Sequence, residues 1–180
     1  TQDAFWQKRH EVARAWAKEH PAPAAPEKGG HPIDAFLISK INRAVAEAQK
    51  TALLLELLNR CNYDSVIVFC RTKHGSDRVA RQLGNAGIKA AAIHGNRSQG
   101  QRQAALDGFK NGRTRVLVAT DIAARGLDIA QLEAVINVDI TPEPELHTHR
   151  VGRTGRADEA GWAFSLASLD EMGRVGRIEE

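Results

Sequence analysis

The segment Val66-Ile67-Val68-Phe69-Cys70 is apolar at every position. A continuous apolar run of this length is typical of a strand that is buried on both faces, as in a parallel sheet. A helical pattern follows over residues 76–85, ends near Gly87, and leads into a second predicted strand at residues 88–93. This strand–helix–strand alternation predicts parallel strands joined by right-handed helical crossovers.

The same alternation continues along the rest of the chain. Ser98 and Gln101 form a capping-box pattern for a helix that runs to about Asn111. Pro144 suits the first turn of a later helix, and a final helix is expected from about Asp170. Further strands are expected at three segments, residues 115–119, 134–138 and 162–166. The predicted fold class is α/β, a three-layer αβα domain with a mainly parallel sheet and an N-terminal helical extension.

The composition is that of an ordinary globular domain. Of the 180 residues 42% are hydrophobic and 26% charged, which is enough to bury a core. The net charge is only +3, so any nucleic-acid-binding surface must be local. Cys61 and Cys70 lack metal-ligand spacing, and we interpret both as buried small hydrophobic residues. No apolar run approaches the ~18 residues of a membrane span, and we expect a cytoplasmic protein.

Residues 1–49 differ in character from the rest of the chain. Residues 3–19 carry an approximate amphipathic stripe with two tryptophans, which is either a docking face or a base-stacking surface. Residues 20–32 are a linker rich in proline and glycine, after which a helical pattern begins again. We therefore divide the chain into an extension at residues 1–49 and a domain at residues 50–180. A tethered apolar helix makes a homodimer possible.

Cationic side chains are concentrated in the segment His149-Arg150-Val151-Gly152-Arg153-Thr154-Gly155-Arg156. Arg153 and Arg156 are three residues apart, so in a helix they project from one face. A guanidinium offers five donors in a fixed fork and suits bidentate binding of phosphate oxygens. The alternative is a solvated basic helix end, which is the usual environment of a run of charges.

Three segments together resemble motifs IV, V and VI of the DEAD-box RNA helicases, in that family's order: residues 66–73, 116–129 and 149–156. Gln99 and Arg102 supply the Gln-x-x-Arg pair that the family has between motifs IV and V. The resemblance extends from about residue 50 to about residue 167 and is specific. It implies the C-terminal, second RecA-like domain of such a helicase.

In that family ATP is held between two α/β domains, and the first domain carries a P-loop and an Asp-Glu-Ala-Asp box. This sequence contains neither pattern. The resemblance therefore implies that the chain shares ATP with a missing N-terminal RecA-like domain, which would hold Mg²⁺, and that the chain alone is inactive. It further implies that Arg153 and Arg156 reach the γ-phosphate as arginine fingers and that His149 touches the carboxylate box of the other domain. Asp128 matches the ribose-binding position, with a cap of the following turn as the alternative.

Several positions match the RNA-facing residues of the family, and by resemblance they would hold the RNA backbone: Arg71, Thr72, Gly95, Gln99, Arg102, Thr120 and Gly126. Backbone contacts position a strand without reading its sequence. The chain departs from the family at Asn96-Arg97, where Arg97 is expected to add positive charge near the RNA. Asp139, directly after the fourth predicted strand, is expected to pair with an arginine of residues 149–156 and to position it.

Two further hypotheses remain besides the prediction that the chain is the C-terminal half of an RNA helicase. The domain and its extension could form a non-catalytic RNA-binding or dimerising module. Alternatively, residues 1–49 could mark an engineered or recombined fusion that carries this domain.

Overall fold

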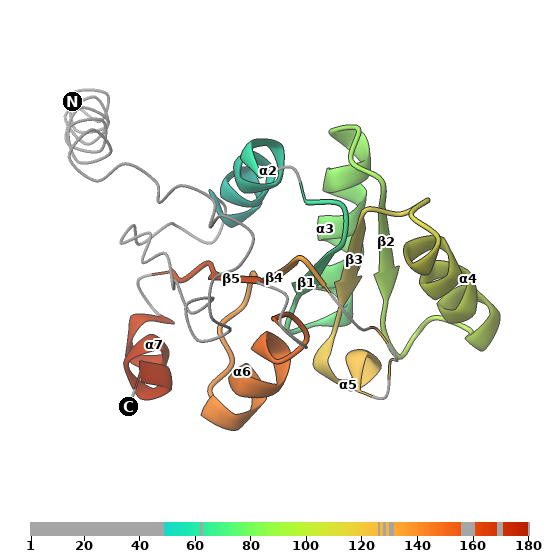
Figure 1. Cartoon of the computed structure of the whole chain (residues 1–180). Helices are drawn as coiled ribbons and strands as arrows, with labels where there is room; N and C mark the ends of the chain where they lie inside the picture. Colours follow the sequence, from blue (N-terminus) through green and yellow to red (C-terminus); the bar gives the residue numbers. More distant parts are fainter. Residues whose placement is uncertain are drawn as a thin grey trace.

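The structure of the chain is a computed structural model, shown in Figure 1. It describes residues 49–61, 63–125, 127, 129, 132–155, 161–168 and 171–179. Almost all of the predicted extension at residues 1–49 lies outside these residues, as do its helix, its linker and the homodimer that it suggested. Within the described part of the chain, no helix is long and apolar enough to cross a membrane.

Five parallel strands form one sheet in the order β2-β3-β1-β4-β5. The strands are β1 (Val66–Phe69), β2 (Ala90–Ile93), β3 (Val116–Ala119), β4 (Ala134–Asn137) and β5 (Trp162–Ser165). Val66 is in register with Val116 on one side and with Ala134 on the other, so β1 is the central strand. The predicted α/β fold with a parallel sheet is confirmed.

Helices precede, connect and follow these strands: α2 (Lys50–Arg60), α3 (Lys73–Asn85), α4 (Gln99–Lys110), α5 (Asp121–Ala124), α6 (Pro144–Val151) and α7 (Met172–Glu179). The predicted capping box of α4 and the proline in the first turn of α6 are both present. α3 begins at Lys73, three residues before the prediction, because the Thr72 hydroxyl accepts a hydrogen bond from the Gly75 amide. The four-residue α5 was not predicted, since one helical turn leaves no periodic pattern in a sequence.

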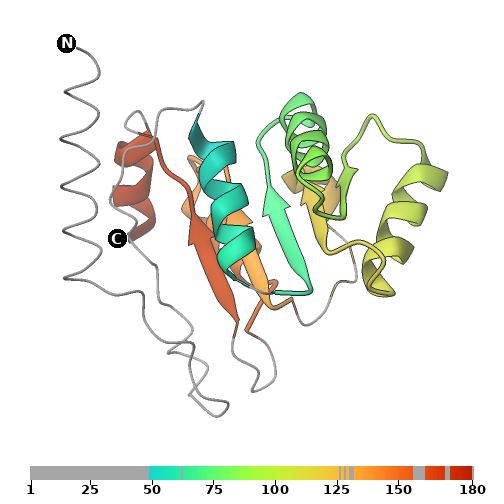
Figure 2. The same ribbon diagram turned by 90° about the horizontal axis from the view of Figure 1, so that it is seen from above.

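The core has two parts, one on each face of the sheet. Leu54 and Leu58 of α2 and Val79 of α3 pack on one face. Phe109 of α4 and Ala123 of α5 belong to the cluster on the opposite face. Figure 2 looks onto the face that α2 and α3 cover. Strands β1, β3 and β4 are buried at every position, as a sheet with helices on both faces requires.

A buried ion pair joins the first and last described helices to the sheet. The Lys50 ammonium pairs with Glu171, which directly precedes α7, and donates to the Val138 carbonyl at 2.9 Å. The Glu171 carboxylate also accepts from the amides of Ile140 and Ser168. Burial opposes ionisation of Glu171, but the hydrogen bonds from Lys50 and Ser168 outweigh it and hold its pKa below the ordinary value. Sequence reasoning missed this pair, because its members are far apart in the chain and neither stands in a recognisable motif.

Candidate functional site

Arg150 fixes the basic segment against the sheet. Its side chain is only 2% exposed, and its guanidinium binds both oxygens of Asp121, at 2.6 and 2.7 Å. A further guanidinium nitrogen donates to Asn137 Oδ1 and to the Asp139 carbonyl, and the group lies 5.1 Å from the centre of the Phe69 ring. A buried, bidentate pair of this kind is rigid, so the end of α6 is held in one position.

Asp139 was predicted to pair with an arginine of residues 149–156, but within the described residues its carboxylate does not make this contact. Asp139 offers Arg150 its backbone carbonyl, and the carboxylate partner is Asp121 at the start of α5. The Asp139 carboxylate instead accepts from the Arg71 amide at 2.7 Å and so ties the loop after β1 to the loop after β4. Asp121 stands beside Thr120 in the sequence, but nothing local shows that it faces an arginine 29 residues further along.

Arg153 lies in a different environment from Arg150. It is half-buried, donates to the Leu127 carbonyl at 3.2 Å, and has no carboxylate partner within the described residues. After α6 the chain is held by the Thr154 hydroxyl, which donates to the Leu132 carbonyl, and turns at Gly155 with φ +65°. Glycine suits this turn because a left-handed backbone costs other residues free energy.

Arg153 and His149 line the same cavity at the carboxyl ends of the strands. It has a volume of about 260 Å³ and is lined by Phe69, Asp121, Ala124, Arg125, Leu146, His149, Arg150 and Arg153. His149 is exposed, whereas its neighbour His147 is buried. Burial and then the Arg150 charge hold the pKa of His147 below its ordinary value, which favours a neutral imidazole. Of the two histidines, only His149 is available to a ligand or a second domain.

The strand order brings the other predicted positions to the same edge. Strands β2, β3, β1 and β4 are neighbours, and Gly95, Thr120, Thr72 and Asp139 follow them closely. Gly95, Gln99, Arg71 and Thr72 are exposed, and Thr120 and Arg102 are half-buried. The Thr120 hydroxyl makes no capping bond to α5, although Thr120 precedes the helix. Thr72 already caps α3, so its hydroxyl has a structural role besides the predicted one. Three predicted positions, Gly126, Asp128 and Arg156, lie outside the described residues.

The expected extra charge of Arg97 is compensated locally. Its guanidinium pairs with Asp77 at 2.5 Å, and the same carboxylate oxygen lies 2.9 Å from His94 Nε2. Partial burial opposes ionisation of Asp77, but the bonds from His94 and Arg97 prevail and hold its pKa below the ordinary value. Arg97 therefore adds less positive charge near the predicted RNA surface than its sequence position suggests.

Both cysteines were interpreted as buried, and the structure bears this out for only one of them. Cys70 is buried, and burial followed by the nearby Asp139 carboxylate raises the pKa of its thiol to about 12. Such a thiol remains protonated and unreactive at neutral pH. Cys61 is only half-buried, so the prediction of a buried residue is wrong there.

Comparisons by sequence and by structure relate this chain to the same class of known proteins. Residues 49–158 match the family described as "Helicase conserved C-terminal domain". The chain is 40% identical over 170 residues to the pre-mRNA-splicing ATP-dependent RNA helicase PRP28 of Pyricularia oryzae, with 94% of this chain and 25% of that protein covered. It is 43% identical over 148 residues to the ATP-dependent RNA helicase CshA of Listeria monocytogenes, with 82% of this chain and 28% of that protein covered.

The solved structures that it resembles include the E. coli DEAD-box protein SrmB bound to the regulator of ribonuclease activity A (RraA). The TM-score is 0.72 at 38% identity, and the match covers 76% of this chain and 80% of that one. The C-terminal domain of the DEAD-box protein Dbp5 matches with a TM-score of 0.68 at 30% identity, over 73% of this chain and 77% of that one. The chain spans about a quarter of the length of the two helicases compared by sequence. Sequence and fold together show that this chain belongs to the DEAD-box RNA helicases as their C-terminal, RecA-like domain.

Proposed function

We propose that the chain forms one wall of an ATP cleft whose other wall is an N-terminal RecA-like domain. Arg153, and with it Arg156, would reach the γ-phosphate of the nucleotide that the other domain delivers. His149 would contact the carboxylate box of that domain, and Asp128 would accept a hydrogen bond from the ribose. The observation that carries this proposal is a contrast between two arginines that line the same cavity: Arg150 is locked on Asp121, whereas Arg153 has only the Leu127 carbonyl as a partner among the described residues.

The chemistry that follows is electrostatic stabilisation. Charge spreads over the phosphoryl oxygens in the transition state, and a guanidinium held in place neutralises it without reorganising. The rigid Arg150–Asp121 pair would supply that fixed position for the residues just after it. ATP and its Mg²⁺ are bound mainly by the other domain in this proposal, so the chain alone should not hydrolyse ATP at a meaningful rate.

RNA would lie along the carboxyl edge of the sheet. Its backbone would contact Gly95 after β2, Gln99 and Arg102 of α4, Thr120 after β3, Arg71 and Thr72 after β1, and Gly126. Glycines and hydroxyls permit close approach to sugars and phosphates, and Arg102 would supply a positive charge. Arg102 and Gln99 share one face of α4, and a guanidinium nitrogen of Arg102 lies 3.4 Å from Gln99 Oε1.

The test is to supply an N-terminal RecA-like domain to this chain. The chain would be joined through a flexible linker to the P-loop domain of a DEAD-box relative, because a linker raises the effective concentration of the second wall. We expect RNA to stimulate ATP hydrolysis by the joined protein. The rate of hydrolysis should fall about 10³-fold or more in Arg153→Ala and in Arg156→Ala. Arg113→Ala is the matched control, since Arg113 is exposed in the loop between α4 and β3, at the opposite edge of the sheet.

The result discriminates between the hypotheses drawn from the sequence. Hydrolysis that disappears in both finger variants and persists in the control supports the cleft. A joined protein that binds RNA but shows no RNA-stimulated hydrolysis favours the non-catalytic module instead.

A further inference from the structure

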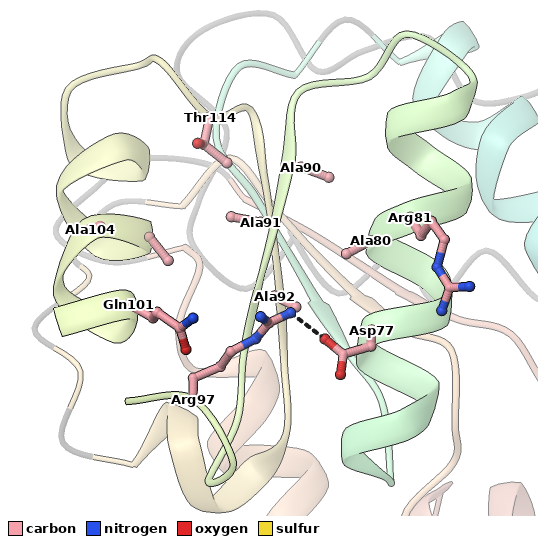
Figure 3. A pocket seen from close by; sticks show the side chains of 11 residues that line it. Asp77, Ala80, Arg81, Ala90, Ala91, Ala92, Arg97, Gln101, Ala104 and Thr114 are labelled. Atoms are coloured by element: carbon pink, nitrogen blue, oxygen red, sulfur yellow. Dashed lines mark hydrogen bonds and ion pairs between the residues drawn. The ribbon is translucent and has the colours of Figure 1, made fainter. Parts of the chain in front are cut away.

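The outer edge of β2 is the floor of a groove that the proposed ATP and RNA sites do not use. The groove has a volume of about 710 Å³, and Ala90, Ala91 and Ala92 form its floor. Figure 3 shows α3 on one side, with Ala80 and Arg81, and α4 on the other, with Gln101 and Ala104. Strand β2 has β3 as its neighbour on one side only, so the other side of the strand is an edge of the described sheet.

The backbone of β2 presents hydrogen-bonding groups to this groove. The carbonyls of Lys89 and Ile93 accept from the amides that begin and follow β3. Because backbone groups alternate sides along a strand, Ala91 also faces β3, whereas Ala90 and Ala92 direct their N–H and C=O groups away from it. An edge strand with such groups is a template for another extended chain.

The residues of β2 are not of the kinds that usually block strand addition. The strand contains no proline and no charged residue, and its alanine side chains leave the walls apart. At one end of the groove the Arg97–Asp77 ion pair crosses in front of Ala92 (Figure 3).

The walls differ in charge, and this difference specifies the occupant. Arg81 on the α3 wall has no hydrogen-bond or ion-pair partner in the part of the chain that is described, and Arg97 Nε is buried without a partner. The Asp77 carboxylate is already compensated by Arg97 and His94. The α4 wall is nearly neutral, with Ala104, Ala105 and the amide of Gln101. Side chains of an added strand alternate between the walls, so acidic residues suit the α3 side and small apolar residues the α4 side.

We propose that the β2 edge is a docking site for an extended partner segment of about four to five residues that alternates acidic and small apolar side chains. The segment pairs with the backbone of Ala90 and Ala92, and its carboxylates bind Arg81. The site is separate from the proposed ATP cleft, because β3 and β1 lie between β2 and β4, which precedes α6.

The probe for this site is a fluorescent peptide, Gly-Val-Glu-Val-Glu-Val-Gly, titrated into the full chain by anisotropy. Amide hydrogen exchange reports where it binds. We expect the amides of Ala90 and Ala92 to exchange more slowly with the peptide, and those of Ala91 and Ile93, which already face β3, to change little. Arg81→Ala should weaken binding by about tenfold, through loss of a charge-assisted hydrogen bond. Arg78→Ala, on an exposed turn of the same helix outside the groove, should leave affinity unchanged.

Two further variants separate backbone pairing from charge. Ala92→Pro removes an outward N–H and should abolish binding, and a peptide with methylated backbone nitrogens should also fail while leaving the protein unaltered. Equal affinity for the lysine version of the peptide, or binding without protection of Ala90 and Ala92, would overturn the proposal. So would displacement of the peptide by a single-stranded RNA oligonucleotide. Protection that rises with protein concentration alone would identify a second copy of the chain as the occupant and would equally overturn it.

Discussion

Arg150 and Arg153 are three residues apart, yet their side chains lie in different environments. Arg150 is buried between Asp121, Asn137 and the Phe69 ring, whereas Arg153 is half-buried and donates to the Leu127 carbonyl. The sequence predicts that arginines gather here, but not which of them is structural. That assignment depends on Asp121, whose contact with Arg150 arises only when β3 and β4 are placed on either side of β1.

The first prediction concerns Arg150 and stability. Arg150→Ala leaves the largely buried Asp121 carboxylate without its partner, and we expect the free energy of unfolding to fall by about 3 to 5 kcal/mol. Arg153→Ala removes one bond to a carbonyl and should cost no more than about 1 kcal/mol. Chemical denaturation of the two variants measures both values. Equal losses would mean that Arg150 does not anchor α6.

A second prediction at this scale concerns Glu171 and pH. Its pKa in the folded chain lies below the ordinary value of 4.5, so the folded state binds fewer protons than the unfolded chain around that pH. The pair with Lys50 therefore contributes its full stability above pH 4.5, and the contribution is lost as pH falls through the lower, folded pKa. Glu171→Gln should destabilise the protein at pH 7 and flatten the pH dependence below 4.5. An unfolding midpoint that falls with pH as steeply in Glu171→Gln as in the unmodified chain would contradict this.

At the scale of the element, contacts between residues close in the sequence could be predicted, and contacts between distant residues could not. The capping box of α4 was predicted because Ser98 and Gln101 contact each other across three residues. The carbonyls at the end of α2 are satisfied from elsewhere in the chain. Arg115, just before β3, donates to the carbonyls of Leu58, Cys61 and Tyr63, at 2.8, 2.7 and 2.5 Å. A residue more than fifty positions away cannot be found from helix-end rules.

The third prediction tests this long-range cap. Arg115→Ala leaves three carbonyls without their donor, and we expect a loss of about 2 to 3 kcal/mol in the free energy of unfolding. Arg113→Ala, two residues away and exposed, should stay within about 0.5 kcal/mol of the unmodified chain. Thermal or denaturant unfolding compares them. A mild effect of Arg115→Ala, equal to that of Arg113→Ala, would show that water replaces the guanidinium at no cost.

At the scale of the whole molecule, the strand order determines the function that can be proposed. The apolar runs predicted the strands and their parallel sense, and the family resemblance suggested the roles of the candidate site residues. Gly95, Thr120 and Thr72 were expected at the carboxyl edge because each follows a strand, but the strand order that makes them neighbours became visible only in the structure. The β2 groove had no sequence signal, because a run of alanines is equally typical of a helix.

The fourth prediction concerns RNA affinity, which belongs to this edge as a whole. If RNA is held by phosphates, log K should fall linearly with log salt concentration, and Arg102→Ala should reduce the slope by about 0.7 for one lost phosphate of a single strand. Titration of a short single-stranded RNA at several salt concentrations measures the slope, with Arg113→Ala as the control. A slope unchanged in Arg102→Ala would remove Arg102 from the RNA surface.

The geometry of the guanidinium at position 153 is the most direct test of the cleft. Lysine keeps the positive charge but loses the planar fork that binds phosphate oxygens. We would measure kcat for ATP hydrolysis at saturating ATP and RNA in the chain joined to a P-loop domain. We predict that kcat of Arg153→Lys falls toward that of Arg153→Ala, about 10³-fold below the unmodified protein. A kcat in Arg153→Lys and Arg153→Ala equal to that of the unmodified protein would show that this arginine does not act on the nucleotide.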